Sequence, residues 1–185
     1  KQLYTSQQIQ TTSTTANHKQ DINEAIKITK KKKNKTPKIV LSWAPHPKAL
    51  PHAVANSFVD VTKRMDAKLT ITHPEGYELS SNITNGIYVT NDQNEAFKNA
   101  DFIYTKNWSS FNNYGKVLKK DLDWMITKSK MNLTNNAKFM HCLPIRRNVV
   151  ASDEVIDSNN SLILNQVENR IYSAQSVLKT IIENG

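Results

Sequence analysis

The sequence has little cysteine, little glycine and no long apolar run. Its single cysteine, Cys142, excludes an internal disulfide framework, so we expect a reducing, cytoplasmic compartment. No secretory signal opens the chain, and no apolar stretch approaches the roughly 20 residues that a membrane-spanning helix needs. The 185 residues suffice for one domain with a hydrophobic core and an additional arm.

The histidines lack the close paired spacings of zinc sites, so we expect no metal. They are His18, His46, His52, His73 and His141. His141 precedes Cys142, but neighbouring residues on a strand point to opposite faces, so a thiol nucleophile with an adjacent base is not expected.

The formal net charge of +9 suits nucleic acid, an acidic membrane surface or small anionic substrates. Four consecutive lysines, Lys30 to Lys33, form the one feature that points to nucleic acid. No aromatic residues interleave with them to stack on bases, which favours a solvated linker instead.

The chain divides into a polar part, residues 1–36, and an apolar part, residues 37–185. Residues 1–20 are rich in Thr, Ser, Gln and Asn, so we expect a poorly fixed arm there. Near-helical spacing of apolar residues then predicts a short helix from Asp21 to about Lys33, which ends before the Thr36-Pro37 break.

After Pro37 the apolar pattern alternates between strands and helices. Compact apolar runs predict strands at 39–43, 68–72, 87–90, 101–104, 138–140 and 161–164. Helical spacing predicts helices at 54–65, 93–100, 152–157 and 167–181, the second with a Thr90/Gln93 capping box and the last docked on the sheet. This alternation predicts an α/β fold, a Rossmann-like, mostly parallel sheet with flanking helices.

In such sheets ligands bind beyond the carboxyl ends of the strands, and three predicted strand ends carry chemically informative residues. The first continues as Ala44-Pro45-His46-Pro47, the second as Lys106-Asn107-Trp108, and the third as His141-Cys142-Leu143-Pro144-Ile145-Arg146-Arg147-Asn148. Trp43 and Trp108 are equally well explained as core or rim aromatics.

The third of these segments, His141-Cys142-Leu143-Pro144, resembles the signature of ornithine-type carbamoyltransferases. The longer stretch 134–148, together with Trp43 to Pro47 and His73 to Leu79, resembles the N-acylornithine branch of that family. The resemblance extends over residues 37–185 and implies the Asp/Orn-binding (amino-acid-binding) domain, with residues 1–36 as a remnant of the interdomain region.

Members of this family transfer a carbamoyl group from carbamoyl phosphate to the side-chain amine of an acylated ornithine in arginine biosynthesis. They act as trimers and use neither metal nor organic cofactor. Such an attack develops negative charge on the carbonyl oxygen and the departing phosphate, which cationic donors stabilise. The resemblance therefore implies small anionic substrates as partners, without membrane or nucleic acid.

The resemblance also implies roles for individual residues. Arg170 is expected to contact carbamoyl phosphate, and Cys142 with Leu143 to line the same site through backbone groups. Arg146 and Lys106 are expected to hold carboxylates of the acylated ornithine. His46 and Pro144 are expected to lie against this substrate.

Family members begin with a domain of comparable size that binds carbamoyl phosphate through a Ser-x-Arg-Thr type motif, which these 185 residues lack. Their His-Pro-x-Gln stretch corresponds here to His18-Lys19-Gln20, without the proline. We therefore expect the chain alone to be inactive. Three interpretations stay open: a transferase component that acts with a separate carbamoyl-phosphate-binding domain, a non-catalytic amino-acid-binding fragment, and a basic nucleic-acid-binding protein.

Overall fold

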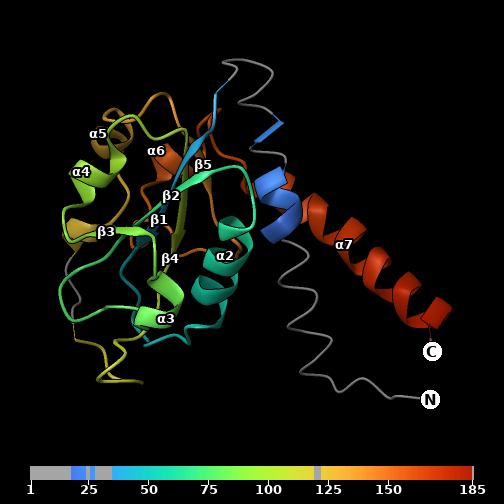
Figure 1. Cartoon of the computed structure of the whole chain (residues 1–185). Coiled ribbons are helices and arrows are strands. Elements are labelled where there is room, and N and C mark those ends of the chain that lie inside the picture. The colour runs from blue at the N-terminus through green and yellow to red at the C-terminus, as the bar shows by residue number, and fades with distance from the viewer. Residues whose placement is uncertain (1–17, 24–25, 28–34, 119–121, 185) are drawn as a thin grey trace.

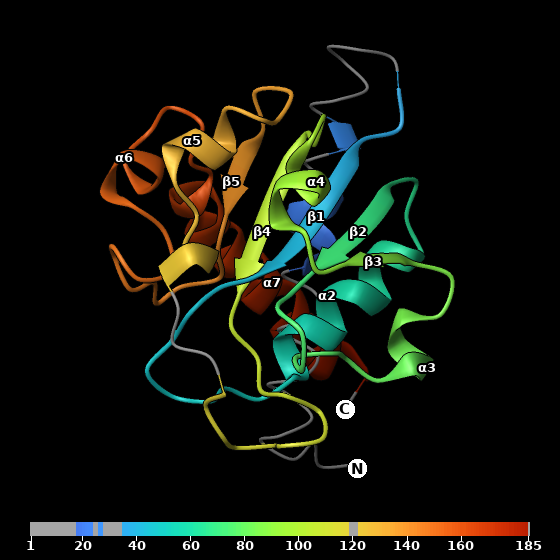
Figure 2. The ribbon, with the colours of Figure 1, turned by 90° about the vertical axis from the view of Figure 1, so that its left-hand side faces the viewer.

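A five-stranded parallel sheet forms the centre of the computed structural model, which describes residues 18–23, 26–27, 35–118 and 122–184. Figure 2 shows the sheet face-on, with the strand order β3-β2-β1-β4-β5. The strands are β1 (Lys38–Trp43), β2 (Lys68–Thr72), β3 (Tyr88–Thr90), β4 (Phe102–Lys106) and β5 (Lys138–Met140). The predicted α/β, Rossmann-like fold class is confirmed.

Helices cover both faces of the sheet (Figure 1). One face carries α4 (Gln93–Phe97), α5 (Lys128–Met131) and α6 (Asp153–Ile156). The other carries α2 (Ala53–Lys63) and the start of α7 (Ile163–Asn184), while α3 (Ser81–Thr84) lies beyond α2 at the edge near β3. A short 3-10 turn, η1 (Leu122–Trp124), precedes α5.

The central strand β1 is buried on both faces because its side chains alternate between two cores. Leu41 and Trp43 pack with Phe58 of α2 on one side. Val40 packs with Phe97 of α4 on the other. This double burial explains the continuous apolar run that predicted the strand.

The strand predicted at 161–164 is wrong. Ser161 makes only an isolated parallel bridge to Phe139, and the Leu162 N–H donates to the Phe139 carbonyl at 2.8 Å. Helix α7 begins at the next residue, Ile163. One bridge at the edge of β5 therefore replaces a sixth strand, because the helical pattern of the following residues takes over.

The cap of α4 also differs from the prediction. Asp92, not Thr90, occupies the N-cap position, and its side chain accepts a hydrogen bond from the Glu95 N–H at 3.0 Å. Thr90 instead donates its hydroxyl to the Glu95 carboxylate at 3.0 Å. Asp is as good an N-cap as Thr, and here it stands next to the helix.

Residues 18–23 and 26–27 are helical, and we call them the N-terminal helical segment. The expectation of a poorly fixed arm up to residue 20 is therefore wrong for 18–20. His18 and Ile22 are buried at 2% and 0% exposure, so one face of the segment belongs to the core. The lysine run at 30–33 lies outside the described residues.

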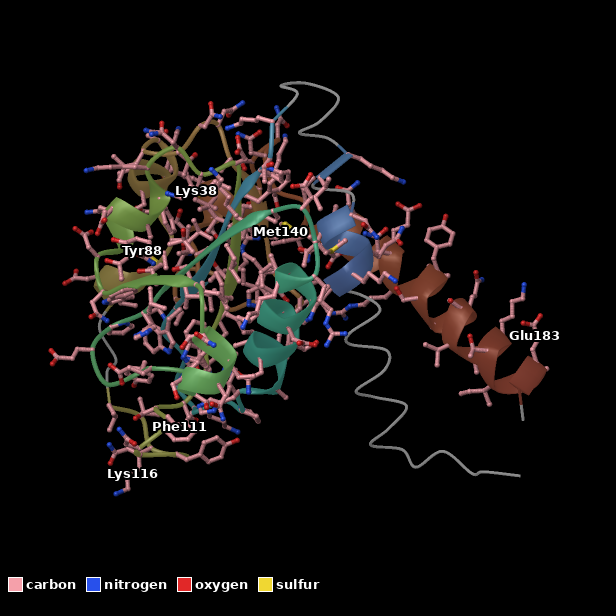
Figure 3. The ribbon with its side chains drawn as sticks, viewed as in Figure 1. Lys38, Tyr88, Phe111, Lys116, Met140 and Glu183 are labelled. Carbon is pink, nitrogen blue, oxygen red and sulfur yellow. The ribbon has the colours of Figure 1, made fainter. Side chains whose placement is uncertain are left out.

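The closing helix is present as predicted, but the prediction that it docks on the sheet along its length is wrong. Only the first turns of α7 lie against the body, and the rest projects away from it, with Glu183 at the far end (Figures 1 and 3). The apolar stripe of the helix is largely exposed, at 58% for both Ile171 and Leu178. Spacing predicted the stripe correctly but could not say which surface covers it. Within the described ranges, no helix is both long and apolar enough to cross a membrane.

Candidate functional site

The carboxyl ends of β1 and β4 are held side by side. Trp43 and Lys106 are partners in the parallel register. Beyond them, the Asn107 amide donates to the Ala44 carbonyl at 2.8 Å, and the Ser109 N–H donates to the Leu50 carbonyl at 2.8 Å. These bonds fix the loop that carries His46 against the end of β4. In Figure 3 the later part of the β4 loop, with Phe111 and Lys116, lies at the edge of the molecule opposite Lys38, which starts β1.

His46 and Arg146 meet across 100 residues of sequence. Arg146 Nε donates to His46 Nε2 at 3.2 Å, so Nε2 is an acceptor. His46 Nδ1 lies 2.9 Å from the carbonyl oxygen of Lys48 and 3.1 Å from its backbone nitrogen. Partial burial lowers the pKa of His46 most, and the charges of Arg146, Lys106 and Lys48 lower it further, although the Lys48 carbonyl opposes the shift. The predicted substrate residues His46, Lys106 and Arg146 therefore form one cationic cluster around a neutral imidazole.

The two neighbouring arginines have different surroundings. Arg147 makes a 2.6 Å ion pair with Asp153 and a second ion pair with Asp157, both at α6. The hydrogen bonds that Arg147 donates to the Asp157 carboxylate are the main cause that raises the pKa of Arg147. Among the described residues no carboxylate pairs with Arg146, which leaves its guanidinium toward His46. Of the pair, Arg146 is the one placed to receive an anion.

The segment after β5 turns sharply at the signature residues. The Leu143 N–H donates to His141 Nδ1 at 3.0 Å, and Leu143 has φ 45°, in the left-handed region. Burial, with the charges of Lys106, Arg170 and His46, lowers the pKa of His141 to about 3. His141 is therefore a neutral ring that holds the turn. Cys142 is half-buried, and the Leu143-Pro144 peptide is cis.

A second group of residues gathers beside this turn. His18 Nε2 lies 3.1 Å from the Tyr104 hydroxyl, and His18 Nδ1 lies 3.1 Å from the Ser57 hydroxyl. Burial raises the pKa of Tyr104 well above its usual value, and the adjacent Cys142 raises it further. Burial, followed by the charge of Arg170, lowers the pKa of His18 to about 4. Arg170, in the second turn of α7, is close enough for its charge to lower the pKa of both His18 and His141.

Both ring nitrogens of His18 are occupied within the protein, so the imidazole works as a buried link between α2 and β4. Sequence reasoning missed Tyr104 entirely, because one tyrosine inside an apolar strand carries no functional signal. Trp43 and Trp108 are core residues: their indole N–H groups donate to the Trp108 and Tyr77 carbonyls. They brace the β4 loop.

At the strand ends, His46 lines a small hollow together with Trp43 and Asn107. A cavity of about 410 Å³ lies elsewhere, between α5, α6 and the amino-terminal end of β5, lined by residues such as Met131, Ala137 and Val155. This cavity contains none of the residues expected to bind substrate. Across the described ranges, no cluster of three or more His, Cys, Asp or Glu side chains is arranged to hold a metal ion.

The arrangement is that of an α/β domain of the ligand-binding kind. Its histidines and cationic side chains lie together at the carboxyl ends of the strands, where such domains bind their ligands. The profile described as "Aspartate/ornithine carbamoyltransferase, Asp/Orn binding domain" matches residues 51–181. The chain therefore belongs to the aspartate/ornithine carbamoyltransferase family, through that domain. This confirms the resemblance inferred from the sequence.

Relatives with named activities place the chain near two branches of the family. N-succinylornithine carbamoyltransferase of Bacteroides thetaiotaomicron is 47% identical over 89% of this chain and 52% of that protein. N-acetylornithine carbamoyltransferase of Xanthomonas campestris is 32% identical over 78% of this chain and 48% of that protein. The chain thus spans about half the length of the relatives it matches.

Solved structures agree with the sequence comparison. Acetylornithine transcarbamylase complexed with acetylcitrulline matches with a TM-score of 0.75 and 31% identity, over 87% of this chain and 54% of that one. A variant of N-acetyl-L-ornithine transcarbamylase complexed with carbamyl phosphate and N-succinyl-L-norvaline matches with a TM-score of 0.76 and 30% identity, over 86% of this chain and 55% of that one.

Proposed function

We propose that this chain is the amino-acid-binding half of a carbamoyltransferase that acts on N-succinylornithine in arginine biosynthesis. The observation that carries the proposal is the convergence of Lys106 and Arg146 on His46. N-succinylornithine bears two carboxylates, and two cationic side chains whose charges both act on His46 suit a dicarboxylate better than the single carboxylate of N-acetylornithine or ornithine. The higher identity to the N-succinylornithine enzyme supports the same choice.

The reaction explains the turn after β5 and the neighbouring Arg170. The side-chain amine forms a bond to the carbonyl carbon of carbamoyl phosphate; the bond to the phosphate oxygen breaks, phosphate leaves with the electron pair, and the amine loses a proton. Backbone groups of Cys142 and Leu143, with Pro144 beside them, would orient the carbamoyl group and the amine. The Arg170 guanidinium would stabilise charge on the phosphate.

We propose further that the carbamoyl-phosphate-binding half is supplied by a separate segment that docks on the exposed stripe of α7. The chain spans about half of its relatives, and the stripe with Ile171 and Leu178 exposes apolar area of the kind that interfaces bury. A complete enzyme would then trimerise as its family does. The cytoplasmic location expected from the lone cysteine remains a prediction.

Calorimetric titration tests the proposal on the chain itself. N-succinylornithine should bind more tightly than N-acetylornithine, and ornithine most weakly. Arg146→Gln should weaken N-succinylornithine about 10- to 100-fold, because it removes one charged hydrogen bond, worth about 1.5–3 kcal/mol. It should change ornithine affinity much less.

Arg64→Gln is the matched control, because Arg64 is a surface arginine whose ion pair with Asp60 lies on α2. It removes the same charge and should leave all three affinities unchanged. Equal losses in both variants would mean that only net charge matters, and an unchanged affinity in Arg146→Gln would refute the assigned role.

Two other functions remain testable in the same samples. Binding of N-succinylornithine without turnover, even with a complementary half present, would indicate a non-catalytic amino-acid-binding fragment. Affinity for DNA or RNA that falls steeply with salt would favour a nucleic-acid-binding role for the lysine run. We expect neither result.

A further inference from the structure

Three buried polar side chains connect the N-terminal helical segment to α7. Asp21, Gln166 and Asn169 are 6%, 5% and 8% exposed. The carboxylate of Asp21 accepts hydrogen bonds from Gln166 Nε2 at 2.9 Å and from Asn169 Nδ2 at 3.0 Å. The N-terminal segment and the start of α7 lie side by side in Figure 1, in agreement with these bonds.

The chain of hydrogen bonds continues to the signature turn. Gln166 Oε1 accepts the backbone N–H of His141 at 2.8 Å, and both groups are buried. A backbone N–H can only donate and an ionised carboxylate can only accept. Gln166 therefore has one orientation that satisfies both neighbours, and Asp21 selects it.

The anchored His141 in turn holds the following residues, because its ring accepts the Leu143 N–H. We propose that Asp21 is a positioning residue: through Gln166 it fixes the backbone of the His141–Leu143 turn, the part of the site expected to orient the carbamoyl group. The effect on ligand binding rests on the proposed function, whereas the effect on the backbone does not.

Packing alone does not explain a carboxylate at this place. His18, Asp21 and Ile22 share one face of the helical segment, and the imidazole and the isoleucine already fill space beside Phe58 and Tyr104. A buried carboxylate costs more than an apolar residue of similar size unless its hydrogen bonds are needed. Here the carboxylate accepts hydrogen bonds from the side-chain amides of Gln166 and Asn169, and these bonds hold the two amides in place.

The first variant is Asp21→Asn, which keeps the shape but adds a donor. If the new NH₂ faces Gln166, Gln166 loses its acceptor or flips away from the His141 N–H; if it faces Asn169, Gln166 keeps its acceptor. Asp21→Ala, which removes both acceptors, is therefore measured beside it. Hydrogen exchange of the His141 amide, measured by NMR in the free chain, should accelerate about 5-fold or more. The Leu41 amide in β1 should keep its protection and serves as the internal control.

The second variant, Asp21→Asn with Gln166→Glu, exchanges the two groups. The amide now at position 21 donates to the carboxylate now at position 166 and still accepts from Asn169. That carboxylate also accepts the His141 N–H. The double variant should restore the slow exchange at His141, although Asp21→Asn alone does not.

Unchanged exchange at His141 in both Asp21→Asn and Asp21→Ala overturns the proposal. So does a double variant that restores neither the protection nor the fold, since this would mean that Asp21 only clamps α7. If Asp21→Asn does not fold, a folded double variant with a protected His141 amide supports the proposal.

The link to function is read from N-succinyl-L-norvaline, titrated into the same proteins. Its affinity should fall in Asp21→Asn and recover in the double variant, following the exchange rate. If even the unaltered chain does not bind it, the proposed function fails while the exchange result still decides the role of Asp21. If affinity and exchange change independently, Asp21 is not a positioning residue for this site.

Discussion

Acid pH should destabilise the fold through His18 and His141, two buried histidines with strongly lowered pKa values. Burial, followed by the charge of Arg170, lowers the pKa of His18 from 6.5 to about 4. Burial, followed by the charge of Lys106, lowers the pKa of His141 from 6.5 to about 3. Below pH 6.5 the unfolded chain therefore binds protons at these two histidines that the folded chain does not bind.

The sign follows from these depressed values. Each neutral histidine contributes stability that is fully present above pH 6.5 and is lost as the pH falls toward its folded pKa. Between about pH 7.5 and about pH 5, linkage gives a loss of about 2 kcal/mol for each histidine, or about 4 kcal/mol for both. This is a large part of the stability of an ordinary domain.

Urea denaturation at the two pH values measures this loss. His141→Asn keeps an acceptor for the Leu143 N–H but cannot titrate, so its loss between the two pH values should be about 2 kcal/mol smaller than that of the unaltered chain. His52→Gln, which changes a histidine at the start of α2, should retain the full loss. If His141→Asn and His18→Asn each lose as much stability as the unaltered chain, the buried histidines are not the cause and the reasoning is refuted.

Two further predictions concern the core and α7. Phe58→Ala should lower the free energy of unfolding by about 3–5 kcal/mol in urea titrations. The reason is that Phe58 is fully buried and the centre of its ring lies 4.0 Å from that of Tyr104. A loss below about 1 kcal/mol would contradict this packing. Ile171→Ser with Leu178→Ser should change stability by less than about 1 kcal/mol, since both side chains are largely exposed. The same double change should abolish association with a complementary carbamoyl-phosphate half in analytical ultracentrifugation, and intact association would mean that the half docks elsewhere.

The local sequence pattern was sufficient to predict elements whose structure depends on neighbouring residues alone. The strand predicted at 68–72 is β2, residue for residue, because an apolar run between a loop and a turn leaves few alternatives. The same reasoning failed at 161–164, where four apolar and polar residues are too few to distinguish a bridge from the start of a helix.

Contacts between distant segments explain what the sequence did not reveal about the site. The positions of His46, Lys106 and Arg146 after predicted strands identified them as candidates from the sequence. The fold brings Arg146 into contact with His46, on which the charge of Lys106 also acts. Asp21 carried no signal, since its partner Gln166 is 145 residues away in the sequence. The exposed stripe of α7 was interpreted as a docked face because periodicity identifies an apolar surface without identifying what covers it.

Complementation tests the central claim most directly. The purified chain is mixed with the half of the Bacteroides thetaiotaomicron relative that it does not match, and carbamoyl transfer from carbamoyl phosphate to N-succinylornithine is followed by phosphate release and formation of the carbamoylated product. We predict turnover in the mixture, none with either half alone, and loss of turnover in Arg146→Gln but not in Arg64→Gln. A mixture that associates and binds N-succinylornithine yet forms no product would contradict the assignment of this chain as half of a carbamoyltransferase.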